Sequence, residues 1–287
     1  MALDTTLPGS YISTQDFSQS NTGIDPSTMP AGELARFIFR ASRRCDRVCK
    51  QVLYSTLDTV QLLEDRSPEG YSIDLSDGIL KLFPKRFPIR SITSVTQQFS
   101  SSEAPAPIQS NWIHIDSGAR WAWIEGTWSS FKRQLPPMYL VFTYVNGWMA
   151  TTLRSQAASG QAVLNLVPQP GQTTVQGIYA GQALEIQDAT PEVVQVLSVA
   201  GNAVTLTANL VSTHAADTFV VESSYNELSF SDVQLATLNF TAFFIKNKGI
   251  APLVLKDERI EGQKISKSDF GLVEEAIDLL LPFTVQA

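Results

Sequence analysis

The sequence predicts an α+β protein in which a helical core carries a small antiparallel sheet and is interrupted by an inserted all-β domain, either a barrel or a sandwich. Three observations support this prediction. Apolar residues recur at helical spacing near both ends of the chain, Asp77-Gly78 lies between two apolar runs, and the composition changes abruptly at Thr151. The predicted parts are an N-terminal arm (1–30), the first part of the core (31–150), the inserted β domain (151–222) and the second part of the core with its C-terminal segment (223–287).

The composition is that of a folded protein with a sparsely charged surface. With 287 residues, 44% of them hydrophobic, the chain can bury a sizeable core and could form two domains. Charged residues make up 17%, which is below the usual quarter, so we expect neighbouring molecules to cover part of the surface. The formal charge of −7 argues against a protein that grips nucleic acid along an extended basic groove.

The sequence contains no apolar run of about eighteen residues that could span a membrane. Its first residues also lack the basic region and apolar core of a signal peptide. We therefore expect no membrane association and folding in a cytoplasm.

Residues 1–30 are rich in Ser, Thr, Gln, Asp, Pro and Gly. They cannot bury enough apolar surface to fold alone, although they can order against a neighbouring subunit. A helix is predicted to begin at Ser27 or Thr28, where a hydroxyl can cap it and Pro30 suits its first turn. Its core-facing stripe consists of Leu34, Phe37, Ile38, Ala41, Cys45, Val48 and Val52.

The two cysteines, Cys45 and Cys49, lie on one face of this predicted helix. Consecutive helical turns hold the backbone too rigidly for an easy disulfide, and two thiols without further ligands make a poor zinc site. We therefore expect both to be buried as small apolar side chains, with no metal bound.

A second stripe on the same helix is cationic, although the protein is acidic. Three interpretations are open: a solvated face, a charge seam between subunits, or a ridge that faces DNA. The stripe consists of Arg36, Arg40, Arg43, Arg47 and Lys50.

A hairpin is predicted around Asp77-Gly78, a two-residue loop that accepts positive φ at low cost. Pro84 and Pro88 then form an extended corner, and the β-branched run Ile89–Val95 is predicted as a third strand. The two-residue loop sets Ser76 opposite Ile79, Leu75 opposite Leu80 and Ile73 opposite Leu82, so that Tyr71, Ile73, Leu75, Leu80 and Leu82 share one face.

Strands unusually rich in aromatic residues are predicted between residues 111 and 145. Their tryptophans could form a platform on which sugars stack, or could pack in the core or in an interface. The tryptophans are Trp112, Trp121, Trp123 and Trp128.

The inserted domain is predicted from short β-branched runs separated by Gly or Asn turns, in a segment with almost no charge. The expected strands are 162–167, 183–186, 192–199, 203–207 and 218–221.

Two more helices are predicted towards the C-terminus. A capping box, Ser231-Asp-Val-Gln234, begins a helix that is apolar over much of its circumference and is therefore expected to be buried on several sides. A last helix runs from about Ser268 until Pro282 stops it, and its acidic edge is Glu274, Glu275 and Asp278.

No catalytic constellation is recognisable. Only His114 and His214 could act as bases near neutral pH, and neither belongs to a metal-binding or triad pattern. Phosphate-binding and dinucleotide-binding fingerprints are missing as well. We therefore predict a protein that is not an enzyme and that binds no cofactor.

The order of these segments resembles the head-tail connector (adaptor) proteins of tailed bacteriophages. The resemblance covers residues 31–150 and 223–287, whereas 151–222 has no counterpart in the short members of that family. The matching stretches are Leu80-Lys-Leu-Phe-Pro-Lys-Arg-Phe-Pro-Ile-Arg-Ser-Ile-Thr-Ser-Val95, Ser229-Phe-Ser-Asp-Val, and Asp257-Glu-Arg-Ile-Glu-Gly-Gln-Lys-Ile-Ser266.

The resemblance implies a helical adaptor core and a structural role in the neck of a virion assembled in a host cytoplasm. Copies would form a ring, expected to be a dodecamer, beneath the portal protein. That ring would extend the DNA channel towards tail or stopper proteins, and genomic DNA would pass through without sequence-specific binding. The family also implies that the C-terminus reaches the portal, through Leu280, Leu281, Phe283 and Val285. Packing of these side chains on the subunit's own core is the other interpretation.

In such a ring the cationic stripe of one subunit could face an acidic edge of the next, either Glu274, Glu275 and Asp278 or Asp257, Glu258 and Glu261. An alternative function follows from the tryptophans and the inserted domain. It is that of a carbohydrate-binding or adhesive β protein of a virion or cell surface.

Overall fold

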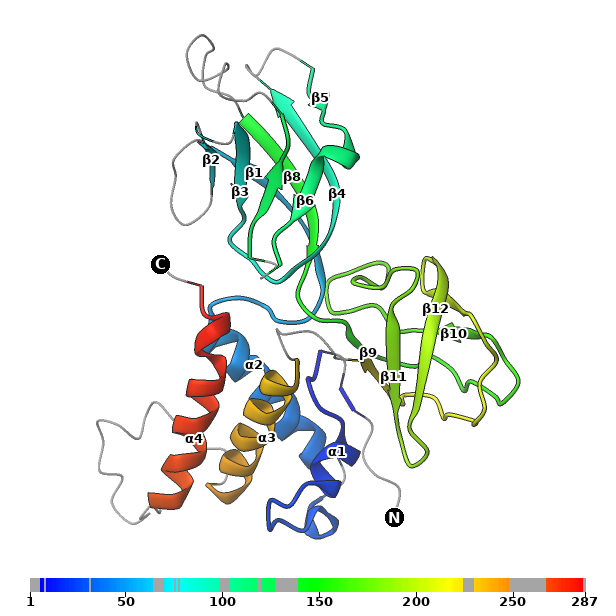
Figure 1. The fold of residues 1–287 in the computed structure, drawn as a ribbon. Coiled ribbons are helices and arrows are strands. Elements are labelled where there is room, and N and C mark those ends of the chain that lie inside the picture. The colour runs from blue at the N-terminus through cyan, green and yellow to red at the C-terminus, as the bar shows by residue number, and fades with distance from the viewer. Residues whose placement is uncertain are drawn as a thin grey trace. The chain divides into compact units, whose positions relative to one another are not determined.

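Antiparallel sheets make up most of the fold, and the α-helices are few (Figure 1). The chain divides into two compact units. We call residues 1–54 with 149–284 the helix-barrel unit, and residues 55–148 with 285–287 the two-sheet unit. This computed structural model describes residues 6–7, 9–30, 32–63, 70–74, 76, 78–98, 104–117, 120–126, 139–223, 230–247 and 267–285.

The predicted helical adaptor core is wrong. Among the described residues of 31–150, one segment, Glu33–Cys49, forms an α-helix, and most of those from 56 onwards lie in strands. The physical reason is visible in the burial pattern: buried side chains alternate with less buried ones with a period of two, as in Ile79–Phe83. The domain boundaries inferred from the sequence stay a prediction.

The helices of the helix-barrel unit are α1 (Thr14–Gln19), α2 (Glu33–Cys49), α3 (Phe230–Lys246) and α4 (Lys267–Leu280), with 3₁₀ turns η1 (Pro26–Thr28) and η5 (Leu281–Phe283). Helices α2, α3 and α4 pack against one another. The predicted positions of α3 and α4 are confirmed. None of the described helices combines the length and the apolar character needed to cross a bilayer.

Helix α2 begins later than predicted. Gly32, with φ of 78°, precedes its first residue, and a left-handed residue cannot continue a helix from η1. Its predicted core stripe is confirmed at Leu34, Ile38, Ala41 and Cys45, which are all buried.

The predicted burial of the two cysteines is also confirmed. Cys45 and Cys49 are free and buried, and burial raises the pKa of both thiols, that of Cys45 to about 12. The Cys45 sulfur lies 3.4 Å from the Thr237 hydroxyl oxygen, on α3. Both cysteines therefore help to seal the helix interfaces.

The barrel part of this unit is one six-stranded antiparallel sheet in the order β10-β13-β12-β11-β14-β9. The sheet curls until its edge strands meet, because Leu153 bridges Leu166 and the Arg154 amide donates to the Asn165 carbonyl over 2.8 Å. The curled sheet encloses an apolar core around Leu184 and Val204. The strands are β9 (Ala150–Thr152), β10 (Val163–Asn165), β11 (Ala183–Gln187), β12 (Glu192–Ala200), β13 (Ala203–Leu206) and β14 (Phe219–Glu222).

The two-sheet unit contains two four-stranded antiparallel sheets, ordered β1-β8-β4-β5 and β2-β3-β7-β6. Both contribute to a single apolar core, for example with Phe142 from one sheet and Leu82 from the other. The strands are β1 (Thr56–Leu62), β2 (Gly70–Asp74), β3 (Ile79–Phe83), β4 (Ile89–Gln98), β5 (Ala106–Pro107), β6 (Ile113–Ile115), β7 (Ala122–Ile124) and β8 (Tyr139–Asn146), and the 3₁₀ turn η2 (Ser110–Trp112) precedes β6.

The predicted hairpin exists, but its register is wrong by two residues. The last pair before the loop is Asp74 with Ile79, and Tyr71 lies opposite Leu82. The Asp74 carboxylate accepts hydrogen bonds from the amide and hydroxyl of Ser76, which starts the turn earlier than predicted. An even shift leaves every side chain on its predicted face, so Tyr71 and Leu82 are still buried.

The N-terminal segment packs on the helices of its own unit. Ile12 and Phe17 join an apolar cluster with Leu34 and Ile38 of α2. Tyr11 is fully buried, and its hydroxyl donates to the Asp46 carboxylate over 2.5 Å. The same hydroxyl oxygen accepts from the backbone amides of Leu53 at 3.1 Å and Tyr54 at 3.2 Å.

We therefore expect Tyr11→Phe to destabilise the protein although the ring is kept. The substitution removes one hydrogen bond each from the Tyr54 amide, the Leu53 amide and the Asp46 carboxylate, of which the last two stay bonded to each other at 3.1 Å. The expected cost is roughly 1 to 3 kcal/mol in the free energy of unfolding. Urea denaturation measures this difference. Tyr179→Phe is the matched control, because that ring is 45% exposed. Equal effects of the two substitutions would show that the Tyr11 hydroxyl is not a structural tie.

Candidate functional site

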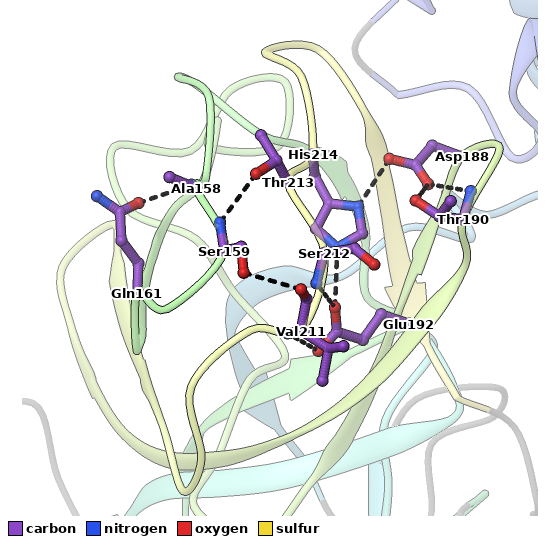
Figure 2. A network of polar contacts seen from close by, with 10 residues as sticks. All are labelled: Ala158, Ser159, Gln161, Asp188, Thr190, Glu192, Val211, Ser212, Thr213 and His214. Carbon is purple, nitrogen blue, oxygen red and sulfur yellow. Dashed lines mark hydrogen bonds and ion pairs between the residues drawn. The ribbon is translucent and has the colours of Figure 1, made fainter.

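A buried histidine in the barrel is held between two carboxylates (Figure 2). The His214 side chain has no exposed surface. Its Nδ1 lies 2.7 Å from an Asp188 carboxylate oxygen, and its Nε2 lies 3.2 Å from a Glu192 carboxylate oxygen. Because both ring nitrogens face acceptors, both contacts are hydrogen bonds only when the ring is an imidazolium. Each ring nitrogen therefore has a carboxylate partner.

The strand connections position these groups. Asp188 follows β11 and also accepts from the Thr190 amide at 2.8 Å, so its carboxylate caps the turn that leads to β12. Glu192 begins β12 and accepts from the amides of Val211 at 2.9 Å and Ser212 at 3.0 Å. His214 pairs with the Ala157 backbone in both directions. Three chain segments, 157, 188–192 and 211–214, therefore meet around His214.

This arrangement favours a structural role over catalysis. Each nitrogen of His214 is already occupied, and the ring has no exposed edge from which to reach a substrate. The two carboxylates approach opposite nitrogens, so they and the ring cannot converge on one ion. Within the described ranges, no group of three or more His, Cys, Asp or Glu residues is arranged to hold a metal.

From the sequence, His214 was considered only as a possible base, and its two carboxylate partners were not predicted. Asp188 and Glu192 lie 26 and 22 residues away along the chain. No local motif connects these positions, and only the curling of the sheet brings them together.

We expect His214→Ala to destabilise the barrel. Two poorly exposed carboxylates would then lose the ring that hydrogen-bonds between them, at a cost of roughly 2 to 4 kcal/mol. Thermal melting followed by far-ultraviolet circular dichroism measures the loss. His114→Ala is the control, because the His114 side chain is 38% exposed. If both variants melt at the temperature of the unmodified protein, the network is not a stabilising element.

The same network predicts acid sensitivity. Burial alone would raise the pKa of the Glu192 carboxyl, but hydrogen bonds from the amides of Val211 and Ser212 and from His214 outweigh it and lower the pKa. A group whose folded pKa is lowered contributes stability above its ordinary pKa of about 4.3 and loses that contribution as the pH falls through the folded value. We therefore expect Glu192→Gln to flatten the decline of stability below about pH 4.3. Urea midpoints across that range test this, with Glu274→Gln as an exposed control.

The cationic stripe of α2 is not a uniform surface. Arg36, Arg40, Arg47 and Lys50 are exposed, but the Arg43 guanidinium turns inward. It donates to the Gly9 carbonyl at 2.5 Å and forms an ion pair of 2.8 Å with Asp46. The Arg43 guanidinium also lies over the rings of Tyr11, Phe39 and Tyr54.

The acidic edge of α4 is exposed at Glu274, Glu275 and Asp278. Neither these three carboxylates nor the four exposed cations of α2 form an ion pair with any residue that the structure describes. The other predicted acidic edge, Asp257, Glu258 and Glu261, lies outside the described residues. The helix-barrel unit thus has two oppositely charged, exposed edges on different helices.

The residues predicted to contact a portal differ in exposure. Leu280, Phe283 and Val285 are buried, whereas Leu281 is 59% exposed. The Phe283 carbonyl accepts from the Gln51 side-chain amide at 2.8 Å, which ties the end of α4 to the segment after α2. Of the four, Leu281 is the one that presents apolar surface to solvent.

Three tryptophans of the two-sheet unit, Trp112, Trp121 and Trp123, lie outside its core, whereas Trp148 is buried. Along β7, Ala122 and Ile124 are buried, and Trp123 points to the opposite face of the sheet β2-β3-β7-β6. We call this opposite side the aromatic face. On it, Trp123 stacks on His114 of β6 with 4.2 Å between ring centroids. Trp128 lies outside the described residues.

A second aromatic pair lies on the aromatic face. The Trp121 ring lies 6.3 Å from that of Phe83, which is 36% exposed. The Lys81 ammonium lies 5.6 Å from the Trp121 ring and forms an ion pair of 2.9 Å with Asp74. Lys81 is directly opposite Trp123 in the β3–β7 register, and His114 is opposite Trp123 in the β6–β7 register. These side chains therefore form one continuous row across three adjacent strands.

Comparisons with known proteins give little further information. No protein-family model and no curated protein matches the chain. A solved structure that matches is the Gp54 tailspike of Acinetobacter baumannii bacteriophage AP22, in complex with A. baumannii capsular saccharide, at 17% sequence identity. The match covers 28% of this chain and 15% of the tailspike, with a TM-score of 0.22. A score this low does not indicate a shared fold.

Proposed function

We propose that this chain is a structural subunit of a tailed-phage virion, and that copies assemble side by side into a ring at the head-tail junction. The observation that supports it most directly is the pair of oppositely charged edges, one on α2 and one on α4, exposed on the same unit. The ordered sequence resemblance to head-tail connector proteins supports it independently.

A ring requires each subunit to present two different contact surfaces in a fixed relation to each other. A heterologous contact joins one surface of a subunit to another surface of the next, and repetition closes the ring when the rotation fits. Helices α2 and α4 both pack on α3, so their charged edges are held in a fixed relation. Complementary charges would set the register of the contact and disfavour wrong pairings.

Charge alone would not hold such a ring together. Exposed ion pairs contribute roughly 0 to 1 kcal/mol each. Apolar burial must supply the rest, and exposed apolar side chains lie on the same helices: Leu235 of α3 is 43% exposed, and Leu281 after α4 is 59% exposed. In the proposed assembly, Leu281 lies at a contact with the portal protein or with the neighbouring subunit.

The remaining partners follow from the resemblance. Tail or stopper proteins would bind the far side of the ring, and genomic DNA would pass through its channel. The net charge of −7 suits this role, because a strongly cationic channel wall would hold the phosphates that must slide past it.

The test is charge reversal on α2. We expect Arg36→Glu with Arg47→Glu to block assembly with itself or on a portal ring, since the acidic edge would then face like charges. The melting temperature should change little, because neither guanidinium has an ion-pair partner among the described residues. Sedimentation velocity and negative-stain microscopy, with and without purified portal rings, measure assembly at low and high ionic strength.

Arg154→Glu is the matched control, because this exposed arginine lies in the barrel and away from α2. Partial rescue should follow from adding Glu274→Lys and Asp278→Lys to the double reversal. If the variant with both Arg36→Glu and Arg47→Glu assembles normally at both ionic strengths, the cationic stripe is only a solvated face. The main support for the ring would then be lost.

Carbohydrate binding is the second candidate function. It is favoured by the aromatic face of the two-sheet unit, where Phe83, Trp121 and Trp123 expose ring surface beside polar side chains. Adaptor and carbohydrate-binding functions use different units of the chain, so one protein can have both.

A further inference from the structure

The aromatic face is unusual because its rings are not used to build the core beneath them. The core side of the same three strands is filled by aliphatic side chains, such as Leu80, Ile124 and Ile115. Large rings on a solvent-facing sheet lose little conformational entropy when a ligand stacks on them, since they have few rotatable bonds. The face is therefore preorganised for a flat apolar surface.

The positive charge of Lys81 on this face is compensated by a carboxylate. Lys81 is paired with Asp74 over 2.9 Å, and the His114 ring lies 3.5 Å from the Glu125 carboxylate. The aromatic face thus lacks the surplus of positive charge that tracks a nucleic-acid backbone. A partner that matches this face is uncharged, has an apolar side that can lie on rings, and has polar groups at its rim.

A pyranose ring has these properties. Its axial C–H groups form an apolar face, and its hydroxyls can donate to the Asp74 or Glu125 carboxylates and accept from the Lys81 ammonium. Because the rings come from the adjacent strands β3, β7 and β6, they form a row across the sheet and not a single pocket. A row suits several residues of a chain better than one free sugar.

We propose that the aromatic face binds a neutral polysaccharide chain, whose pyranose rings stack on Trp121 and Trp123 while the paired charges of Asp74 and Lys81 bond its hydroxyls. This inference rests on the second candidate function and specifies its site and ligand class. It does not depend on ring assembly.

The experiment is isothermal titration calorimetry of the full chain with three neutral probes: cellohexaose, maltohexaose and hexa-N-acetylchitohexaose. We expect at least one to bind, and Trp123→Ala to weaken that binding by at least about tenfold. Trp123→Phe should retain most of the affinity because a ring remains. The matched control is Tyr179→Ala, which removes a ring that is 45% exposed in the other unit and should leave binding unchanged.

Circular dichroism melting separates loss of binding from loss of folding. If Trp123→Ala melts at a lower temperature than the unmodified protein, Trp121→Ala tests the same face. Binding by the unmodified protein that neither substitution weakens would overturn this site but leave carbohydrate binding intact. Failure of all three probes to bind the unmodified protein would overturn the second candidate function itself. Binding of oligothymidylate in place of the sugars would overturn the ligand class.

Discussion

The helix-barrel unit depends on one partly buried charged group, the Arg43 guanidinium, whose side chain is 27% exposed. A guanidinium cannot be taken out of water without partners, because the unpaired charge would cost several kcal/mol. Its partners come from separate parts of the chain: the Gly9 carbonyl from the N-terminal segment and the Asp46 carboxylate from α2. The Tyr54 ring, which Arg43 also contacts, donates from its hydroxyl to the Pro170 carbonyl in the barrel at 3.4 Å. One cation thus connects the arm, a helix and a barrel loop.

The barrel uses another ionisable side chain, His214, in a similar way. His214 lies between Asp188 and Glu192, and these carboxylates are in turn held by backbone amides of two loops. Charged groups are therefore used inside this unit to fix loops that apolar packing alone would leave poorly specified. This use explains why a segment so poor in charge keeps these particular ionisable residues.

The surfaces that remain available for function are distributed between the two units. The helices present charged edges, which suit contacts that must have one register. The sheets of the other unit present aromatic rings, which suit a ligand that stacks. Both surfaces carry groups that suit binding. The resemblance to connector proteins concerns segments of both units, but the helical core which it implies is not the fold of this chain.

Local periodicity allowed the sequence to determine α3, α4, the burial of Cys45 and five of the six strands of the barrel, while β9 was missed. Each depends on which side chains lie on one face of a single element, and that is set by spacing along the chain. The hairpin at Asp74 shows the limit of this reasoning: the faces were right and the register was wrong, because hydrogen bonds within the loop decide where pairing begins. Only the tertiary structure decided that Arg43 turns inward, that Trp123 points outward, and that His214 meets Asp188 and Glu192. These outcomes depend on partners far away in sequence, and no pattern within one element encodes the neighbour that a side chain will find across a closed sheet.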